Sequence, residues 1–385
     1  MSWHCVRNLP GSKGNRMKIV HVIEPMSHGV FIWVIDMANY LVERGYDVTI
    51  IHSLREETPE NWRSLFDSRV TLIHVQMGRA INPWTDIKAL YQVVREIKRI
   101  QPDVIHGHSS KSGVLARAAG FLLGQSKRTL YTSHAIHYPL IKQPVKRALY
   151  KYLELVAYWM GGTVIACSKR EYDIILKEIT KGNTRRLTRI SNGIDLSQVV
   201  AKDYHQQSDT VQIGVLGRIS HQKAPWIFAA IAKELSSKYE NIDFVWIGSG
   251  DPEDEQPLRD AGVKITGALS RTEALKAMAG LDIFLQTSLY EGLSLALLEA
   301  QATGIPAVVS NIPGNDEVVQ HEQCGFVGND EAELAHYVER LIQSPTLRAQ
   351  LGTGARQYVL EHFSLEVMGA QYEDLYQQVS SSNSH

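Results

Sequence analysis

The sequence predicts an α/β fold built from two doubly wound, Rossmann-like domains that face a central cleft. Apolar runs bounded by turn residues alternate with segments of helical period along almost the whole chain, which is typical of parallel sheets. The 385 residues exceed one ordinary hydrophobic core and suit two domains of roughly 150–200 residues. The alternation weakens once, in the polar stretch 203–209 (DYHQQSD), and then restarts. Open parallel sheets bind ligands beyond the carboxyl ends of their strands, so these ends should line the cleft.

The first half of the chain contains six segments with the composition of buried strands. Each is a short apolar run that ends at a turn or before a helical period. The predicted strands are 17–24, 47–52, 70–75, 103–106, 128–132 and 163–166. Helices are predicted over 31–44 and near 84–100, and Gly45 stands where a helix C-cap glycine belongs.

The second half repeats this pattern. The predicted strands are 211–216, 242–247, 263–266, 281–286 and 307–310. The helical segment 365–379 has no strand to serve, so we expect it to pack across the domain junction. The predicted divisions are a disordered extension or the product of an upstream start codon (1–16), a first domain (17–198), a linker (199–209), a second domain (210–364) and a final helix with its tail (365–385).

Composition excludes several classes of protein. No stretch of about 18 uncharged apolar residues is present, and residues 1–16 lack the apolar core of a signal peptide. The three cysteines show no metal-ligand spacing, which favours a reduced, cytoplasmic compartment. Residues 1–198 carry 28 Lys and Arg against 16 Asp and Glu, a balance of +12, whereas residues 199–385 have a balance of −13. A basic half without a nucleic-acid module indicates a membrane surface or a lipid phosphate as partner.

A pair of carboxylates follows the predicted strand 281–286. Glu291 precedes Gly292, and Glu299 lies eight residues further on, a little over two helical turns, so the two can share a face. Gly292 and Ser294 would let an anion approach the amides of the following helix, predicted over 293–302. Carboxylates accept hydrogen bonds from paired sugar hydroxyls. The alternative is that Glu291 caps the helix and Glu299 is solvated.

Two cations follow the predicted strand 211–216. Arg218 and Lys223 lie in the turn Gly217–Lys223 (GRISHQK), where they can neutralise a diphosphate, Arg218 with a forked guanidinium. The alternative is a solvated surface turn.

These segments together resemble the retaining nucleotide-sugar glycosyltransferases of family four (glycosyl transferases group 1), which have the GT-B fold. The resemblance covers nearly the whole chain, from Met17 to about Val379. The matching segments are Glu291-Gly292-Leu293 through Glu299-Ala300, Thr303–Pro306, Pro313–Glu317, Gly217-Arg218 with Lys223, Ile247–Gly250, Asn192–Asp195, and Phe363-Ser364 followed by Tyr372 and Tyr376. It implies an acceptor-binding first domain, a nucleotide-sugar-binding second domain and a crossover helix in 365–385.

The resemblance also implies roles for individual residues. Glu299 would hold the donor ribose, Glu291 the transferred hexose, and Arg218 and Lys223 the diphosphate, with the turn at 267–271 as the base-binding edge. The implied donor-binding residues are Gly217, Arg218, Lys223, Gly248, Arg271, Glu291, Gly292, Leu293, Ser294 and Glu299. The implied catalytic residues are His134, Glu291, Arg218 and Lys223.

The acceptor side departs from the family pattern. Tyr131–Ala135 (YTSHA) resembles a family segment that ends in His-Gly, which would place His134 at the cleft, but Ala135 replaces the glycine and His137 competes for the role. The first strand–helix turn has Ser27-His28-Gly29 where many members have a run of glycines. The implied acceptor-binding residues are Gly29, His108 and His134. A packing or capping role is the alternative for His106 and His108.

The implied activity is retaining transfer of a hexose from a nucleotide diphosphate sugar, with UDP-sugar favoured, to a lipid-linked or saccharide acceptor. No cofactor or metal is expected, because Arg218 and Lys223 supply the charge and the acidic run 251–255 reads as a solvated loop. A nucleotide-sugar epimerase of the same fold and a non-catalytic nucleotide-sugar-binding protein are the alternatives.

The segment 142–162 (KQPVKRALYKYLELVAYWMGG) combines four basic residues with apolar residues at helical spacing. Such a helix can lie on an anionic membrane, which would place the protein at the inner face of the cell membrane. The alternative is a core-packed helix with a solvated basic face.

Overall fold

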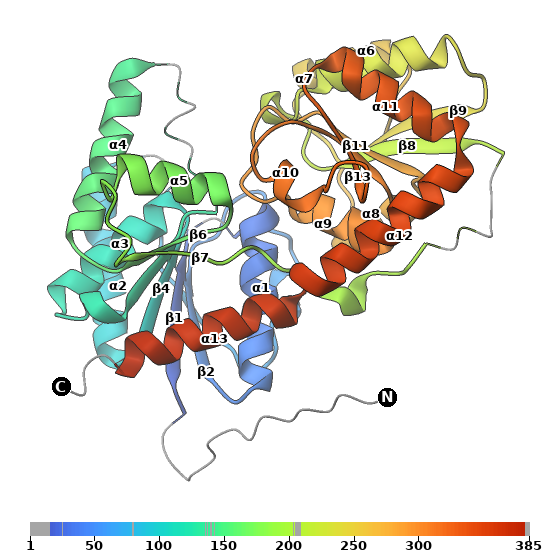
Figure 1. The fold of residues 1–385 in the computed structure, drawn as a ribbon. Coiled ribbons are helices and arrows are strands. Elements are labelled where there is room, and N and C mark those ends of the chain that lie inside the picture. Colours follow the sequence, from blue (N-terminus) through green and yellow to red (C-terminus); the bar gives the residue numbers. More distant parts are fainter. Residues whose placement is uncertain are drawn as a thin grey trace, which may run out of the picture.

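A computed structural model describes residues 16–381, apart from residues 25, 79–80, 135, 137, 139–140, 142, 203 and 205–208. The extension predicted for residues 1–16 and most of the polar linker stretch therefore fall largely outside the described residues. Two α/β domains lie side by side, and the C-terminal helix returns to the first (Figure 1).

The N-terminal domain contains a seven-stranded, fully parallel sheet with the order β3-β2-β1-β4-β5-β6-β7. The strands are β1 (Lys18–Ile23), β2 (Asp47–His52), β3 (Thr71–His74), β4 (Val104–His108), β5 (Thr129–Thr132), β6 (Thr163–Ala166) and β7 (Leu187–Arg189). The sequence did not predict β7, because three residues with one buried side chain carry no apolar run. Strand β4 also runs two residues beyond its predicted end, so Gly107 and His108 lie within the sheet.

In the described part of the N-terminal domain, five α-helices connect the strands. They are α1 (His28–Glu43), α2 (Pro83–Ile100), α3 (Ser110–Leu122), α4 (Pro144–Trp159) and α5 (Lys169–Glu178). Helix α1 begins three residues before its predicted start, with Ser27 in extended conformation at the N-cap. Helix α2 has Asn82 as N-cap and proline at its first position, a combination that fixes its start well.

The C-terminal domain contains a six-stranded parallel sheet with the order β10-β9-β8-β11-β12-β13. The strands are β8 (Val211–Leu216), β9 (Ile242–Ile247), β10 (Lys264–Ile265), β11 (Ile283–Gln286), β12 (Ala307–Ser310) and β13 (Gly325–Gly328). The helices are α6 (Pro225–Ser236), α7 (Pro252–Asp260), α8 (Arg271–Ala279), α9 (Leu295–Thr303), α10 (Asn315–Val318), α11 (Glu331–Gln343), α12 (Pro345–His362) and α13 (Leu365–Ser381).

The prediction of a solvated loop at 251–255 is wrong. Residues 252–255 form the first turn of α7, with Pro252 at the first helical position and three acidic residues in that turn. Acidic side chains at a helix N-terminus interact favourably with the helix dipole, so the run stabilises a helix start.

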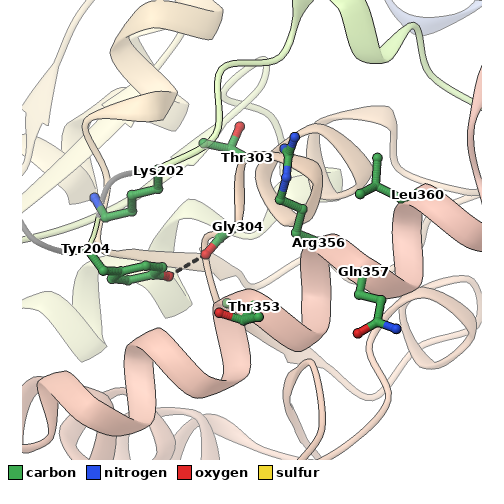
Figure 2. Close-up of a pocket in the computed structure, with 9 residues that line it drawn as sticks. Lys202, Tyr204, Thr303, Gly304, Thr353, Arg356, Gln357 and Leu360 are labelled. Atoms are coloured by element: carbon green, nitrogen blue, oxygen red, sulfur yellow. Dashed lines mark hydrogen bonds between the residues drawn. The ribbon is translucent and has the colours of Figure 1, made fainter. Parts of the chain in front are cut away.

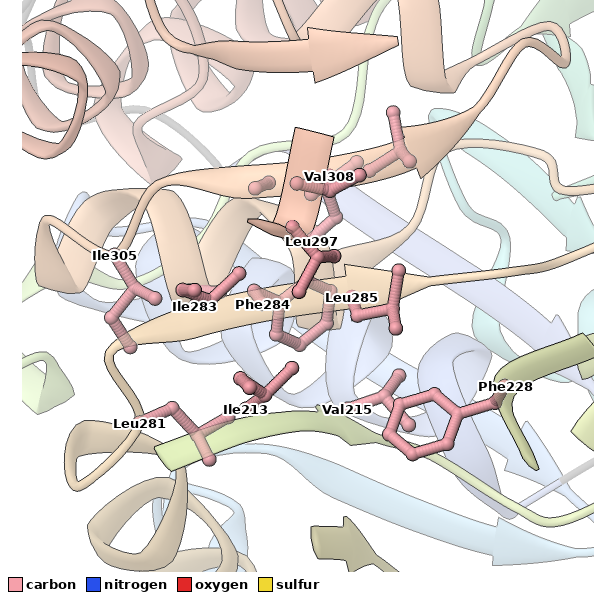
Figure 3. Close-up of a cluster of buried hydrophobic side chains, with 14 of the residues drawn as sticks. Ile213, Val215, Phe228, Leu281, Ile283, Phe284, Leu285, Leu297, Ile305 and Val308 are labelled. Carbon is pink, nitrogen blue, oxygen red and sulfur yellow. The ribbon is translucent and has the colours of Figure 1, made fainter. Parts of the chain in front are cut away.

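The core of this domain lies between the sheet and its helices. Figure 3 shows Ile213 and Val215 of β8, Phe284 of β11 and Val308 of β12 gathered with Leu297 of α9, all nearly inaccessible to solvent. Strands buried on both faces read as continuous apolar runs, which is why the sequence predicted β8, β9 and β12 with their observed bounds.

Helix α13 leaves the C-terminal domain and packs against α1 of the N-terminal domain (Figure 1). Met368, Tyr372 and Tyr376 are buried within the N-terminal core, and the Trp33 indole N–H lies 3.1 Å from the Met368 sulfur. The expected packing across the domain junction is therefore present.

The linker is tied to the C-terminal end of α9. The Lys202 amide donates to the Thr303 carbonyl at 2.7 Å, and the Tyr204 hydroxyl donates to the Gly304 carbonyl (Figure 2). Arg356 of α12 donates to the Ala302 carbonyl in the same place. These bonds satisfy carbonyls that a helix end leaves unpaired, so the helix that carries Glu299 is fixed at its far end.

Candidate active site

The carboxyl ends of β8 and β9 enclose a cavity of about 590 Å³. Gly217, Arg218 and Gly248, three of the residues that the resemblance implies for donor binding, line it. A Cβ atom at Gly248, whose φ is +141°, would lie 2.2 Å from the Gly217 carbonyl oxygen. Only glycine permits this approach of the two strand ends. The Arg218 side chain is 44% exposed, and its nearest carboxylate, Asp251, is 3.8 Å away, so the guanidinium remains accessible to a ligand.

Lys223 and Glu291 form a buried ion pair beyond β8 and β11. The Lys223 Nζ to Glu291 Oε1 distance is 2.6 Å, and the two side chains are 14% and 9% exposed. The Ser288 hydroxyl donates to the same carboxylate at 2.8 Å and the Gln222 amide at 3.3 Å. The structure therefore joins the two predicted motifs through one pair.

Glu299 forms a second pair, with Arg271 at the start of α8. The Arg271 Nη2 to Glu299 Oε1 distance is 2.6 Å, and the Glu299 side chain is 3% exposed. Burial raises the pKa of the Glu299 carboxyl, and Arg271 opposes the rise. The alternative of a solvated Glu299 and a capping Glu291 is wrong, because Ser294 accepts from the Leu297 amide as N-cap of α9.

The backbone after Glu291 is held from both domains. The amide of Asn192, in the N-terminal domain, donates to the Leu293 carbonyl at 3.2 Å. A Cβ atom at Gly314, whose φ is +92°, would lie 2.2 Å from the Gly292 carbonyl oxygen. This close packing fixes the loop that leads into α9.

Glu291 also lines a small cavity between the domains. The N-terminal domain contributes Ile136, Ser168, Arg170 and Glu171 to it. On the same side, Gly29 at the start of α1 is exposed, and a Cβ placed on it would meet Leu295 of the opposite domain at 3.7 Å. The N-terminal domain, predicted to bind the acceptor, and the C-terminal domain, predicted to bind the donor, therefore meet at this place.

His134 is the second residue after β5 and has a positive φ of 59°. Its Nε2 is 3.0 Å from Nδ1 of His108, and burial lowers the pKa of His134 to about 3. His108 is fully buried in β4, so in this conformation it makes no direct contact with a ligand. Any effect of His108 on an acceptor would have to pass through His134. Ala135 and the competing His137 lie outside the described residues.

Glu171 of α5 is a site residue that was not predicted from the sequence. Its carboxylate accepts from the Ser133 hydroxyl and from the Cys167 amide, the latter at 2.7 Å, and thus ties α5 to the residue before His134. Burial raises the pKa of Glu171. A Ser-x-x-Glu pattern from Ser168 to Glu171, directly after a predicted strand, is the capping signal that could have located this helix start.

The geometry defines a class of protein: two doubly wound domains with a nucleotide-sized cavity and buried carboxylate–cation pairs at facing strand ends. Residues 27–198 match the family described as Glycosyltransferase Family 4, and residues 210–344 match Glycosyl transferases group 1. The chain belongs to the family 4 glycosyltransferases, and its fold is GT-B.

Relatives span nearly the whole chain. The UDP-Gal:α-D-GlcNAc-diphosphoundecaprenol α-1,3-galactosyltransferase of Escherichia coli is 27% identical, covering 95% of this chain and 98% of its own. The capsular polysaccharide biosynthesis glycosyltransferase CapM of Staphylococcus aureus is 23% identical, covering 88% and 91%.

Solved structures share the fold. Sucrose-phosphate synthase from Thermosynechococcus elongatus superimposes with a TM-score of 0.80 at 18% identity, covering 96% of this chain and all of that one. Anabaena HepE in complex with UDP and glucose gives 0.77 at 19% identity, covering 94% and 100%.

Proposed function

We propose that this glycosyltransferase moves a hexose from a UDP-sugar to a lipid-linked saccharide, with retention of anomeric configuration and without a metal. The observation that carries the proposal is two ion pairs of the C-terminal domain, Lys223–Glu291 and Arg271–Glu299. Lys223 lies next to Gly217, which lines the 590 Å³ cavity: a Cβ atom on Gly217 would lie 3.3 Å from Lys223 Cε. The E. coli relative, named for UDP-galactose and a diphosphoundecaprenol acceptor, supports a lipid-linked acceptor and a uridine donor.

The proposed division of roles is the one that the family resemblance implies, and the positions of the two carboxylates support it. Glu299 lies behind Arg271 and binds the ribose hydroxyls, whereas Glu291 lines the interdomain cavity and binds the hexose hydroxyls. Arg218 and Lys223 stabilise the charge that develops on the leaving diphosphate, which takes the place of a divalent cation. When the donor binds, the Lys223–Glu291 ion pair is exchanged for contacts to the donor. Lys223 then contacts a phosphate, and Glu291 contacts a hexose hydroxyl.

Retention is proposed to proceed by front-face displacement. Glu171 is an N-terminal carboxylate near Glu291, but each of its oxygens already accepts a hydrogen bond from the N-terminal domain. A carboxylate bound in this way positions the His134 segment and is a poor nucleophile. The acceptor hydroxyl then attacks on the face that the diphosphate leaves, and a phosphate oxygen takes its proton. The protein supplies orientation and leaving-group stabilisation.

The direct test is transfer from UDP-galactose, UDP-glucose and UDP-N-acetylglucosamine to an N-acetylglucosamine diphosphate lipid. We expect one donor to give product in chelator-treated buffer, with the α configuration read from the anomeric proton coupling. Glu291→Gln should lower kcat by about 10²-fold or more, because it removes a contact to the reacting sugar. A β product, or full activity of Glu291→Gln, contradicts the proposal. Donor epimerisation without acceptor would indicate the epimerase instead.

We also propose that α4 rests on the inner face of an anionic membrane. Its apolar residues Val145, Leu149, Tyr152 and Trp159 are 82%, 49%, 62% and 73% exposed, whereas Tyr150, Leu155 and Tyr158 pack against a core cluster. One face of the helix is therefore core-packed, as the alternative expected, and another face exposes apolar side chains. Only Ala157 of α4 is buried. Lys146 and Arg147 are on the same helix. None of the helices in the described part of the chain has the length and hydropathy needed to cross a bilayer.

Neighbouring helices extend this apolar surface. Phe121 of α3 packs beside Trp159 at 5.6 Å between ring centroids, and Trp84 and Tyr91 of α2 are 84% and 68% exposed. Helix α3 contacts both α2 and α4, so the three helices are adjacent. Such an apolar surface with basic residues is typical of interfacial binding.

Flotation with phosphatidylglycerol vesicles tests the membrane proposal. We expect the protein to bind in low salt and Trp159→Ser to bind several-fold less. Trp226→Ser is the matched control, because Trp226 is also exposed but lies on α6 of the acidic domain. Equal binding of the two variants, or binding that 0.5 M salt leaves unchanged, would contradict it.

A further inference from the structure

Four histidines of the N-terminal domain form a cluster. His21 of β1 and His106 of β4 are paired in the parallel register, and His108 follows on β4. These three side chains are inaccessible to solvent, and half-buried His134 lies above them. Trp33 of α1 packs against His108 and His134, with ring centroids 4.9 and 5.2 Å apart.

Three of the histidines form one hydrogen-bonded chain. His134 Nε2 is 3.0 Å from His108 Nδ1, and His108 Nε2 is 2.8 Å from His21 Nδ1. His106 belongs to a different network, because its nitrogens are each 2.9 Å from the hydroxyls of Tyr376 and Thr132. The chain therefore runs from the buried His21 to the partly exposed His134 and includes no other described residue.

All three rings are neutral. Burial lowers the pKa of His21 and of His134 to about 3, and lowers that of His108 well below its usual value. A neutral imidazole has one N–H and one acceptor nitrogen, so both hydrogen bonds must be donated in the same direction along the chain. The direction decides which nitrogen of His134 carries the proton.

His21 sets this direction. Its Nε2 is buried and has no hydrogen-bond partner in the described structure. A buried N–H without an acceptor is rarer than a buried acceptor without a donor, so the His21 proton belongs on Nδ1. His21 then donates to His108, and His108 donates to Nε2 of His134. The proton of His134 is left on Nδ1, which points away from the chain because the two ring nitrogens face nearly opposite directions.

We propose that His21 and His108 are positioning residues that hold His134 as the Nδ1–H tautomer, so that it offers the sugar in the cleft a hydrogen-bond donor and no base. The inference rests on the proposed function, because it takes His134 to face the transferred hexose. It agrees with a mechanism in which the donor phosphate receives the acceptor proton.

A buried metal is the competing use of these side chains. Nitrogens of His21, His106 and His108 lie within 4.8 Å of one another. Five of these six ring nitrogens already have hydrogen-bond partners, so His21 Nε2 is the one lone pair left for an ion. Three-coordinate binding would also require one His106 contact, to Tyr376 or to Thr132, and one His108 contact to break.

The experiment is ¹⁵N NMR of the full chain labelled at histidine, in which the nitrogen shifts distinguish the two tautomers. We expect wild-type His134, assigned by its absence in His134→Gln, to be protonated at Nδ1. His21→Phe keeps a ring beside His108 but removes the donor, so the His134 tautomer should become mixed or reversed. His21→Asn places an amide near the former Nδ1 and should restore it. His106→Phe is the control, an equally buried change outside the chain.

Kinetics give the second readout. We expect His21→Phe to lower kcat roughly tenfold with little change in KM, and His21→Asn to recover most of the loss. An Nε2–H tautomer in the wild type, an unchanged tautomer in His21→Phe, or stoichiometric metal in the purified protein would overturn the inference. The NMR result needs neither donor nor acceptor. If no UDP-hexose is transferred while the tautomer is as predicted, the proposed function fails and the positioning chain stands.

Discussion

Glu299 illustrates how a single carboxylate is kept buried before any ligand is present. Isolated burial of a carboxylate costs several kcal/mol, and the Arg271 guanidinium at 2.6 Å offsets this cost. The same arrangement recurs at Lys223 and Glu291. Both cations are already in place, so under the proposed function a sugar donor would meet a preorganised site, where its hydroxyls and phosphates replace these contacts.

His52, at the end of β2, gives a prediction about pH. Burial, together with His74 and Arg63, lowers its pKa to about 4, and neither ring nitrogen has a partner in the described structure. Between pH 6.5 and 4 the unfolded chain binds a proton here that the folded chain does not. This contribution to stability is therefore complete above pH 6.5 and is lost as the pH falls.

His52→Phe should remove that dependence. We expect the slope of the unfolding free energy against pH to decrease by up to about 1.4 kcal/mol per pH unit in this window. Urea titrations of both proteins at half-unit steps measure it. Parallel curves for wild type and variant would show that His52 is not a buried neutral histidine.

At the scale of elements, the sequence predicted the strands with continuous apolar runs and missed those without them. Strands β2, β6 and β8 have their predicted bounds, whereas β7 and β13 are short and are defined by pairing with a neighbour. The acidic run at the start of α7 was wrongly predicted to be a loop. Acidic residues stabilise a helix only near its N-terminus, and composition alone does not show where that helix begins.

The same limit applies to the site. Glu291 and Glu299 were predicted from spacing and from the resemblance, since both lie in one segment. Their cations come from other segments, and the Arg271 contact to Glu299 joins residues 28 apart in sequence. Glu171 was missed because its two hydrogen bonds exist only after α5 docks against the segment before His134.

The docking of α13 provides a prediction at this scale. A Cβ atom at Gly369 would lie 2.2 Å from the Tyr40 ring of α1, so helix α13 can pack only with glycine there. We expect Gly369→Ala to lower stability by about 1–3 kcal/mol through overpacking, although alanine favours helices. Gln371→Ala, at an exposed position of α13, is the control and should change little. Equal melting temperatures for the two variants would refute the close contact.

At the scale of the whole molecule, Glu317 joins the two domains across the cleft. Its carboxylate, on α10, accepts from the Lys169 amide at the N-terminus of α5 at 2.5 Å and lies 3.5 Å from Arg189. The first amides of a helix are free donors with a favourable dipole, so a carboxylate from the other domain caps α5 only while the cleft is closed.

Glu317→Ala should therefore favour an open molecule. We expect a larger radius of gyration in small-angle X-ray scattering and a several-fold higher KM for the donor, with the melting temperature nearly unchanged. Asp316→Ala, at the exposed neighbouring position, is the control. An unchanged radius and KM in Glu317→Ala would mean that this contact does not hold the domains together.

The central claim is that Glu299 and Glu291 divide the donor between them. Calorimetric titration of UDP and of a UDP-hexose into three proteins tests it most directly. Glu299→Ala should bind both ligands at least tenfold more weakly, because both contain the ribose. Glu291→Ala should bind UDP at least as tightly as the wild type does, because Lys223 is no longer paired, and should lose affinity only for the UDP-hexose. Wild-type affinity of Glu299→Ala for UDP, in a variant that remains folded, would contradict the account.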